Sequence, residues 1–132
     1  MGRTELREHI FRMLFLIEFN KEEEMPEQVE LYLDKIEGLT EQNRDYIVNK
    51  HAAIVAKTAE IDELLNLHTT GWKTTRMNKV DLTILRLAVY EIKWDEDVPA
   101  GVAINEAVEL AKKYSSDEGP SFVNGVLGKI AG

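Results

Sequence analysis

The sequence predicts an all-α protein, and three observations support this fold class. Apolar residues recur three or four residues apart through most of the chain, which is the period of an amphipathic helix. No segment shows the apolar–polar alternation between turn signals that is typical of hairpin strands. Pro26, Pro99 and Pro120 fall between the periodic segments and therefore mark their boundaries.

The N-terminal part begins with a helix expected over 4–19, whose apolar stripe consists of Leu6, Ile10, Leu14 and Ile17. The charged run 21–24 is expected to be a solvated loop. Pro26 suits the first position of a second helix, because this position needs no backbone N–H. Gly38 is a natural end for that helix.

A third helix is expected from Thr40 to about Leu67. The apolar period continues over this whole length, which predicts a kink or a break near Thr58. His51 lies near the apolar face of this helix. A buried structural histidine is a better interpretation of that position than a metal ligand.

The C-terminal part begins with a loop over 68–71 and a short helical turn within 72–77. Asn78 or Asp81 is expected to cap the next helix, because either side chain can accept a hydrogen bond from a free N–H of the first turn. This helix is apolar nearly all round, which predicts that it is the central and most buried element.

Two more helices complete the prediction, one over 99–114 and a last one after a loop over 115–120. Gly125 and Gly128 fall inside the last helix, where each costs about 1 kcal/mol relative to alanine. We therefore expect another helix to pack closely against these two glycines.

The chain of 132 residues has the length of one domain, expected to span 1–132 with halves of about 1–67 and 68–132. The formal net charge is -8, so RNA binding would need a local basic patch or a basic partner. The chain has no cysteine, no apolar run of membrane-spanning length and no apolar segment behind Met1. These features predict a cytoplasmic protein that does not enter a membrane.

The sequence contains no recognisable catalytic constellation. His9, His51 and His68 lack the spacing of metal ligands, and there is no glycine-rich phosphate loop or nucleophile elbow. The acidic runs 22–24 and 95–97 fall in expected loops, where carboxylates are solvated. We therefore expect no catalytic residues, no metal and no cofactor.

Polar residues inside the apolar C-terminal half need partners, because a buried charge is stable only when it is paired. Arg86 lies among leucines, and Asn105 and Glu106 lie among apolar residues. We expect a structural polar network in which Arg86 pairs across helices with Glu106 or Glu91. A contact between Arg86 and a ligand is the alternative.

Two aromatic residues are candidates for contact with RNA, because unpaired bases stack on aromatic rings. Phe122 follows the expected loop 115–120, and Phe15 lies at the edge of the first apolar stripe. From spacing alone, core packing is the better interpretation of both rings.

Three segments of the C-terminal half resemble the NusB family of transcription antitermination factors. They are 80–92 with the pattern LR-x-A-x-YE, 98–112 with VAINEAVELAK, and 122–127 with FVNGVL. The segments stand in the order and spacing of the family, and with the first helix the resemblance covers essentially the whole chain. The same fold occurs as a domain of an rRNA cytosine methyltransferase, but this chain carries no catalytic portion, which favours the stand-alone factor.

The resemblance implies two small helical bundles packed as one domain that binds and does not catalyse. It implies binding to the boxA element of nascent transcripts, above all of rRNA leaders, together with the ribosomal protein NusE. The resulting complex acts on RNA polymerase and supports rRNA synthesis. Members of this fold occur as monomers or dimers, so a homodimer stays open.

The resemblance also implies a set of contact residues. Asp81 is the candidate acidic contact for NusE. The resemblance reverses the core interpretation of Phe122 and, more moderately, that of Phe15. By position, the RNA surface falls on Arg3, Arg7, Phe15, Ser121 and Phe122.

The arginine-rich N-terminal segment of the family is thin in this chain, since Thr4, Glu5 and Glu8 stand where basic residues are common. Each lost phosphate contact removes about one released counterion. We therefore expect the chain alone to bind boxA RNA weakly and to depend on the basic NusE. A protein-interaction bundle without RNA binding is a second hypothesis. An RNA-modifying enzyme is a third, which no sequence feature supports.

Overall fold

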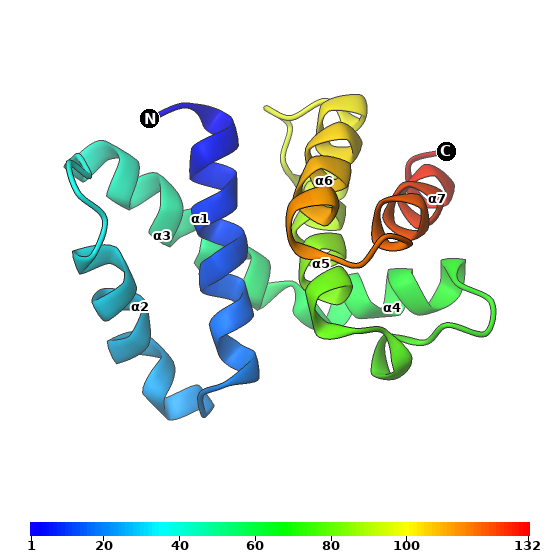
Figure 1. The fold of residues 1–132 in the computed structure, drawn as a ribbon, viewed down its shortest axis with the longest axis horizontal. Helices are drawn as coiled ribbons and strands as arrows, with labels where there is room; N and C mark the ends of the chain where they lie inside the picture. The colour runs from blue at the N-terminus through cyan, green and yellow to red at the C-terminus, as the bar shows by residue number, and fades with distance from the viewer. The chain divides into compact units, whose positions relative to one another are not determined.

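The computed structural model describes all residues, Met1–Gly132, and confirms the all-α class (Figure 1). Seven α-helices and three short 3-10 helices account for its regular structure, and there is no strand. The chain forms two compact units, Met1–Val55 and Ala56–Gly132. No helix combines the length and the apolar character that a membrane crossing requires.

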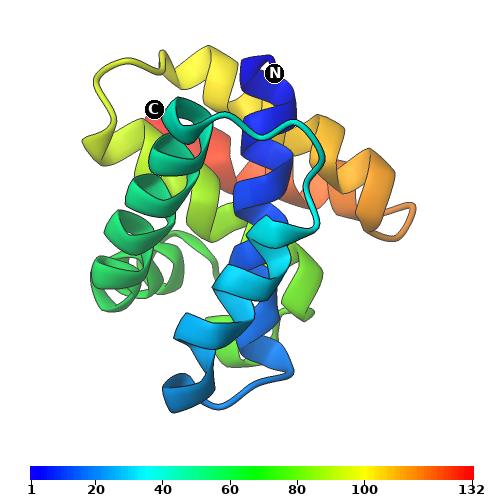
Figure 2. The same ribbon diagram turned by 90° about the vertical axis from the view of Figure 1, so that its left-hand side faces the viewer.

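The first unit contains α1 (Arg3–Phe15), α2 (Met25–Asp34) and all of α3 (Glu41–Ala56) except Ala56. The predicted first helix is too long, because its last turn narrows to the 3-10 helix η1 (Leu16–Glu18). The charged run forms η2 (Glu22–Glu24), and the chain then reverses into α2 (Figures 1 and 2). Buried apolar side chains of this unit are Leu6, Ile10, Phe11, Met13, Leu33, Ile47 and Ile54.

Two histidines are structural parts of the first unit. His9 Nδ1 lies 2.7 Å from the Tyr32 hydroxyl, which joins α1 to α2. The Nε2 atom of His51 is buried without a hydrogen-bond partner. Burial lowers the pKa of His51, and a hydrogen bond to the backbone of Met13 opposes this shift only in part. These features favour the structural interpretation of His51.

A break separates α3 from α4 (Thr58–His68), as the length of the apolar period predicted. Lys57 has φ -102° and ψ 4°, which departs from helical geometry and ends α3. The boundary between the units therefore falls before α4. The sequence placed the division near Leu67, about one helix too late.

The second unit is built on α4, α5 (Lys79–Trp94), α6 (Ala100–Tyr114) and α7 (Gly119–Ala131). The helices α5, α6 and α7 contact one another, and α4 contacts α5 and α7 (Figure 1). The prediction that the apolar helix is central is confirmed for α5. Its buried apolar residues are Leu82, Ile84, Leu85, Leu87, Ala88 and Val89.

The expectation about the glycines of the last helix is wrong. Gly125 and Gly128 are exposed, and a Cβ atom at either position would meet nothing within 4 Å. The close approach on α7 is instead at Gly119, which is buried. The sequence prediction placed Gly119 in the loop 115–120, whereas α7 begins at Gly119.

Candidate nucleic-acid interface

Three hydrogen bonds hold Asp81 in place in the first turn of α5, and two of them reach its carboxylate. Asn78 is the N-cap, and its Oδ1 accepts from the backbone N–H of Asp81 at 2.8 Å. The amide of Asn78 donates to Asp81 Oδ2 at 2.9 Å, and the hydroxyl of Ser115 donates to Asp81 Oδ1 at 2.5 Å. Asp81 is only 6% exposed, so it anchors the end of α6 to the start of α5. Its contact with NusE stays a prediction.

Gly119 allows α7 to begin against this anchor. A Cβ atom at this position would lie 2.5 Å from Ser115 Cβ and 3.2 Å from Asp81 Oδ1. Only glycine fits there without movement of the neighbouring groups. The close approach fixes the first turn of α7 and, with it, the position of Phe122.

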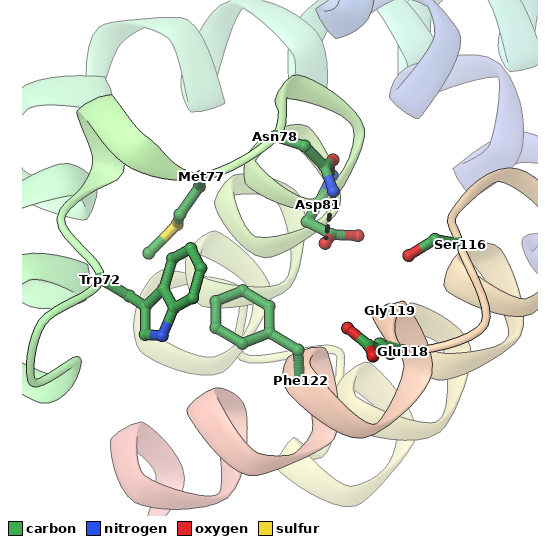
Figure 3. Close-up of a pocket in the computed structure, with 8 residues that line it drawn as sticks. All are labelled: Trp72, Met77, Asn78, Asp81, Ser116, Glu118, Gly119 and Phe122. Carbon is green, nitrogen blue, oxygen red and sulfur yellow. Dashed lines mark hydrogen bonds between the residues drawn. The ribbon is translucent and has the colours of Figure 1, made fainter.

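An open hollow of about 200 Å³ lies beside this anchor, as Figure 3 shows. The rings of Trp72 and Phe122 lie next to one another at one end of it and meet edge to face, with centroids 6.1 Å apart. Met77 lies beside them, and the carboxylates of Asp81 and Glu118 line the other end. The hollow thus combines aromatic walls with negative charge.

The predicted RNA-contact residues fall in both units. In the second unit, Ser121 is exposed and Phe122 is half-buried, and the two residues are neighbours at the start of α7. In the first unit, Arg3 is exposed at the start of α1, whereas Arg7 is only 6% exposed. Contact between Arg7 and a phosphate would therefore require its guanidinium to leave a buried position.

Phe15 lies between two other phenylalanine rings of the first unit. Its centroid is 6.2 Å from that of Phe11, nearly parallel, and 5.3 Å from that of Phe19, edge to face. Phe15 is half-buried, while Phe19 is 73% exposed. Sequence reasoning overlooked Phe19, although the four-residue spacing of the three rings could have indicated it.

The predicted partner of Arg86 is wrong. Its Nε donates to Asp62 Oδ1 at 2.9 Å and its Nη2 to Asp62 Oδ2 at 2.7 Å, so α5 pairs with α4. Glu91 lies on another face of α5, five residues further on, and is fully buried. The arginine is nevertheless paired across helices, as its place among leucines required.

The other members of the predicted polar network differ from one another. Glu106 is half-buried, but Asn105 is exposed. The buried face of α6 consists of Ala103, Ala107, Leu110 and Ala111, and Asn105 lies opposite to it. Asn105 therefore does not belong to a buried network. Its neighbours in the sequence are apolar, but successive residues of a helix point in different directions, so Asn105 and its buried neighbours lie on different faces of α6.

Further features of the site bear on its chemistry. No group of three or more histidine, aspartate or glutamate side chains is arranged to hold a metal ion.

Trp72 lines the hollow and is 55% exposed, yet the sequence prediction gave it no role. A large aromatic residue directly after an expected loop, at the start of the short helical turn 72–77, was the signal that could have identified it.

The comparisons with known proteins agree with this fold. A model of the NusB family matches residues 4–132. The transcription antitermination protein NusB of Agathobacter rectalis is 54% identical over 131 residues, which is 99% of this chain and 100% of that protein. The protein of the same name from Lachnoclostridium phytofermentans is 51% identical and covers 98% of both chains.

Two solved structures are similar over nearly the whole chain. The T. maritima NusB structure has a TM-score of 0.90 and 32% identity, and the match covers 99% of this chain and 91% of that one. NusB in a crystal structure of the antitermination factors NusB and NusE with dsRNA has a TM-score of 0.85 and 25% identity, with 98% and 95% covered. The family model, the curated relatives and the fold agree, and this chain belongs to the NusB family.

Proposed function

We propose that this protein is a transcription antitermination factor that binds boxA RNA together with NusE and supports rRNA transcription. The observation that carries the proposal is the start of α7, where Ser121 is exposed beside Phe122 and the ring of Phe122 meets that of Trp72 at an open hollow. An exposed tryptophan ring and a half-buried phenylalanine ring next to a hydroxyl donor suit unpaired bases. The related complex of NusB and NusE with dsRNA supports the choice of both partners.

The protein acts in this proposal by binding and not by catalysis. It works in the cytoplasm, as part of the antitermination complex of RNA polymerase. Membership of a family whose curated relatives are antitermination proteins supports this role. The polar groups at the site, Asn78, Asp81 and Ser115, are bonded to one another, which suits a structural anchor better than an acid or base.

The charge of the chain favours a basic protein partner. The net charge is -8, and the hollow carries Asp81 and Glu118 at one end. Such a surface attracts a basic protein and repels bare RNA phosphate. We therefore propose that NusE completes the RNA surface, and that Arg3, Arg7 and Phe15 of the first unit contribute to it.

The test is fluorescence anisotropy of a labelled boxA RNA, titrated with this protein, with NusE, and with both at fixed salt. We expect tight binding only with both proteins. Phe122→Ala should weaken the ternary complex on the order of tenfold, because a stacked base contributes about 1–3 kcal/mol. Asn124→Ala is the matched control, since Asn124 is exposed on the same helix. An equal loss in both variants would refute the Phe122 contact.

A second function, a protein-interaction bundle without RNA binding, rests on the thin arginine-rich segment, in which Arg7 is buried and Arg12 pairs with Glu8 at 3.9 Å. It predicts a stable complex with NusE on a sizing column and no anisotropy change with RNA. The same column separates a homodimer from the complex with NusE.

A further inference from the structure

A groove runs between α7 and the loop that follows α4. Trp72 and Phe122 line it, together with Ser121 and Val126 of α7. Lys129 also lines it and is exposed. The lining is therefore mainly apolar and includes two aromatic rings and one cation.

No acidic residue lines this groove, although the protein as a whole is acidic and the adjoining hollow, which shares Trp72 and Phe122, carries Asp81 and Glu118. Between Glu63 and Asp81 there is no aspartate or glutamate, and none follows Glu118. The same stretches contain exposed cations, none of which makes an ion pair: Lys73, Arg76, Lys79 and Lys129. Lys129 lines the groove, and Lys73, Arg76 and Lys79 follow Trp72 along the chain. An acidic protein needs such local cations in order to bind RNA.

The loop that carries Trp72 is held in one shape by internal hydrogen bonds. The hydroxyl of Thr69 lies 2.7 Å from the carbonyl of Leu65 and 2.6 Å from that of Trp72, so it can donate to either. The backbone N–H of Thr74 donates to Asn66 Oδ1 at 2.8 Å. Gly71 has φ +79°, which permits the turn just before Trp72. The ring is thus positioned before any ligand arrives.

We propose that this groove holds a segment of single-stranded RNA, with a base against Trp72 and phosphates beside Lys129, Lys73, Arg76 and Lys79. The inference rests on the proposed function and extends its RNA surface beyond Ser121 and Phe122. Stacking needs an accessible ring, and Trp72 is 55% exposed. Phosphate contact needs cations without an ion pair, and Lys73, Arg76, Lys79 and Lys129 make none, although Lys73 Nζ donates to the carbonyl of Asn66 at 3.3 Å.

The groove also changes what is expected of the N-terminal segment. There, Arg3 is exposed but Arg7 is buried, and Glu5 and Glu8 reduce the positive charge. Lys73, Arg76 and Lys79 offer phosphate contacts in addition to that of Arg3 on α1. In this protein, much of the salt dependence of RNA binding therefore comes from the second unit.

The first test uses the two tryptophans of the chain, Trp72 and Trp94. In Trp94→Phe, Trp72 is the only tryptophan, and titration with boxA-containing single-stranded RNA in the presence of a tryptophan-free NusE should quench its fluorescence. In the reciprocal variant Trp72→Phe, RNA should leave the fluorescence of Trp94 unchanged. Anisotropy of the labelled RNA, recorded on the same samples, shows whether RNA is bound.

The second test measures how the affinity for this RNA depends on salt. The triple variant Lys73→Gln, Arg76→Gln, Lys79→Gln should reduce the slope of log K against log salt by roughly 2, at about 0.7 for each single-strand phosphate contact. Lys129→Gln should reduce it by about 0.7. The control is Lys93→Gln, an exposed lysine at the opposite end of α5 from Asn78, which should not change the slope.

The outcomes separate this inference from the proposed function. Quenching of Trp72 together with the reduced slopes supports the groove. A second result is that anisotropy shows RNA binding while Trp72 is not quenched, or while the salt slopes of the groove variants equal that of Lys93→Gln. Either form of this result refutes RNA binding in the groove and leaves the proposed function standing. No RNA binding with or without NusE refutes the proposed function, and the groove with it.

Discussion

Arg86 of α5 and Asp62 of α4 form a two-pronged ion pair, with Nε to Oδ1 at 2.9 Å and Nη2 to Oδ2 at 2.7 Å. The side chains are only 20% and 24% exposed, so solvent screens the pair weakly. The pair ties α4 to the central helix of the second unit. Because the guanidinium of Arg86 is bonded to Asp62, the pair also argues against the alternative that Arg86 contacts a ligand.

Asp62→Asn should lower the free energy of unfolding by about 1–3 kcal/mol, because it leaves a half-buried guanidinium without its counter-charge. Urea unfolding followed by circular dichroism measures this loss. Glu63→Gln is the control, since Glu63 is the exposed neighbour on the same helix. Equal stability of the two variants would show that the pair contributes nothing measurable.

Gly119→Ala should destabilise the protein by about 1–3 kcal/mol, because the new methyl group would overlap Ser115 and crowd Asp81. Gly128→Ala should have the opposite sign and stabilise by up to about 1 kcal/mol, because this position is open and helical. Thermal melts of the two variants and the parent give both values. Adding Ser115→Gly to Gly119→Ala should recover part of the loss, and no recovery would contradict the steric explanation.

The periodicity of apolar residues was sufficient to predict the helices and the central place of α5, because burial of one helix face repeats in the sequence. The break at Lys57 followed from the length of the period. The boundary between the units did not follow, because the sequence does not show that α4 contacts α5 and α7. The start of α7 was also misplaced, since Gly119 packs against Ser115 and against Asp81 of α5, and the contact with Asp81 is distant in sequence.

The candidate site depended more on three-dimensional contacts. Phe122 and Ser121 were identified through family resemblance, whereas spacing alone favoured a core position for Phe122. Trp72 was missed because its significance lies in its contact with Phe122, which is fifty positions away in the chain. Asp62 was missed as the partner of Arg86 for the same reason. Sequence patterns reveal which face of a helix is buried, but not which residue it meets.

The stability of the protein should decrease as the pH falls below about 6.5, the ordinary pKa of histidine. Burial lowers the pKa of His51 in the folded chain, and its Nε2 has no partner. Below about pH 6.5 the unfolded chain takes up a proton that the folded chain binds less readily, so the free energy of unfolding falls until the lowered pKa is reached. Well above pH 6.5, His51 is neutral in both the folded and the unfolded chain, so it no longer makes stability depend on pH.

Urea unfolding at about pH 5.5 and pH 7.5, on either side of that ordinary pKa, measures the effect. The difference between the two pH values should shrink in His51→Gln. It should not vanish, because burial also lowers the pKa of His9. Asn49→Gln, an exposed change on the same helix, should keep the full difference. A difference of equal size in His51→Gln and the parent would exclude His51 as its source.

Asp81 can act as a structural anchor, as a contact for NusE, or as both, and two variants distinguish these roles. Ser115→Ala removes the hydrogen bond to Oδ1 but keeps the carboxylate, while Asp81→Asn removes the charge at a similar shape. If Asp81 contacts a basic partner, Asp81→Asn should weaken NusE binding about fivefold or more beyond Ser115→Ala, since a charged hydrogen bond contributes about 1.5–3 kcal/mol. If Asp81 is only an anchor, both variants should lower the melting temperature and leave the NusE affinity equal. Titration calorimetry with NusE, performed well below both melting temperatures, separates the two results.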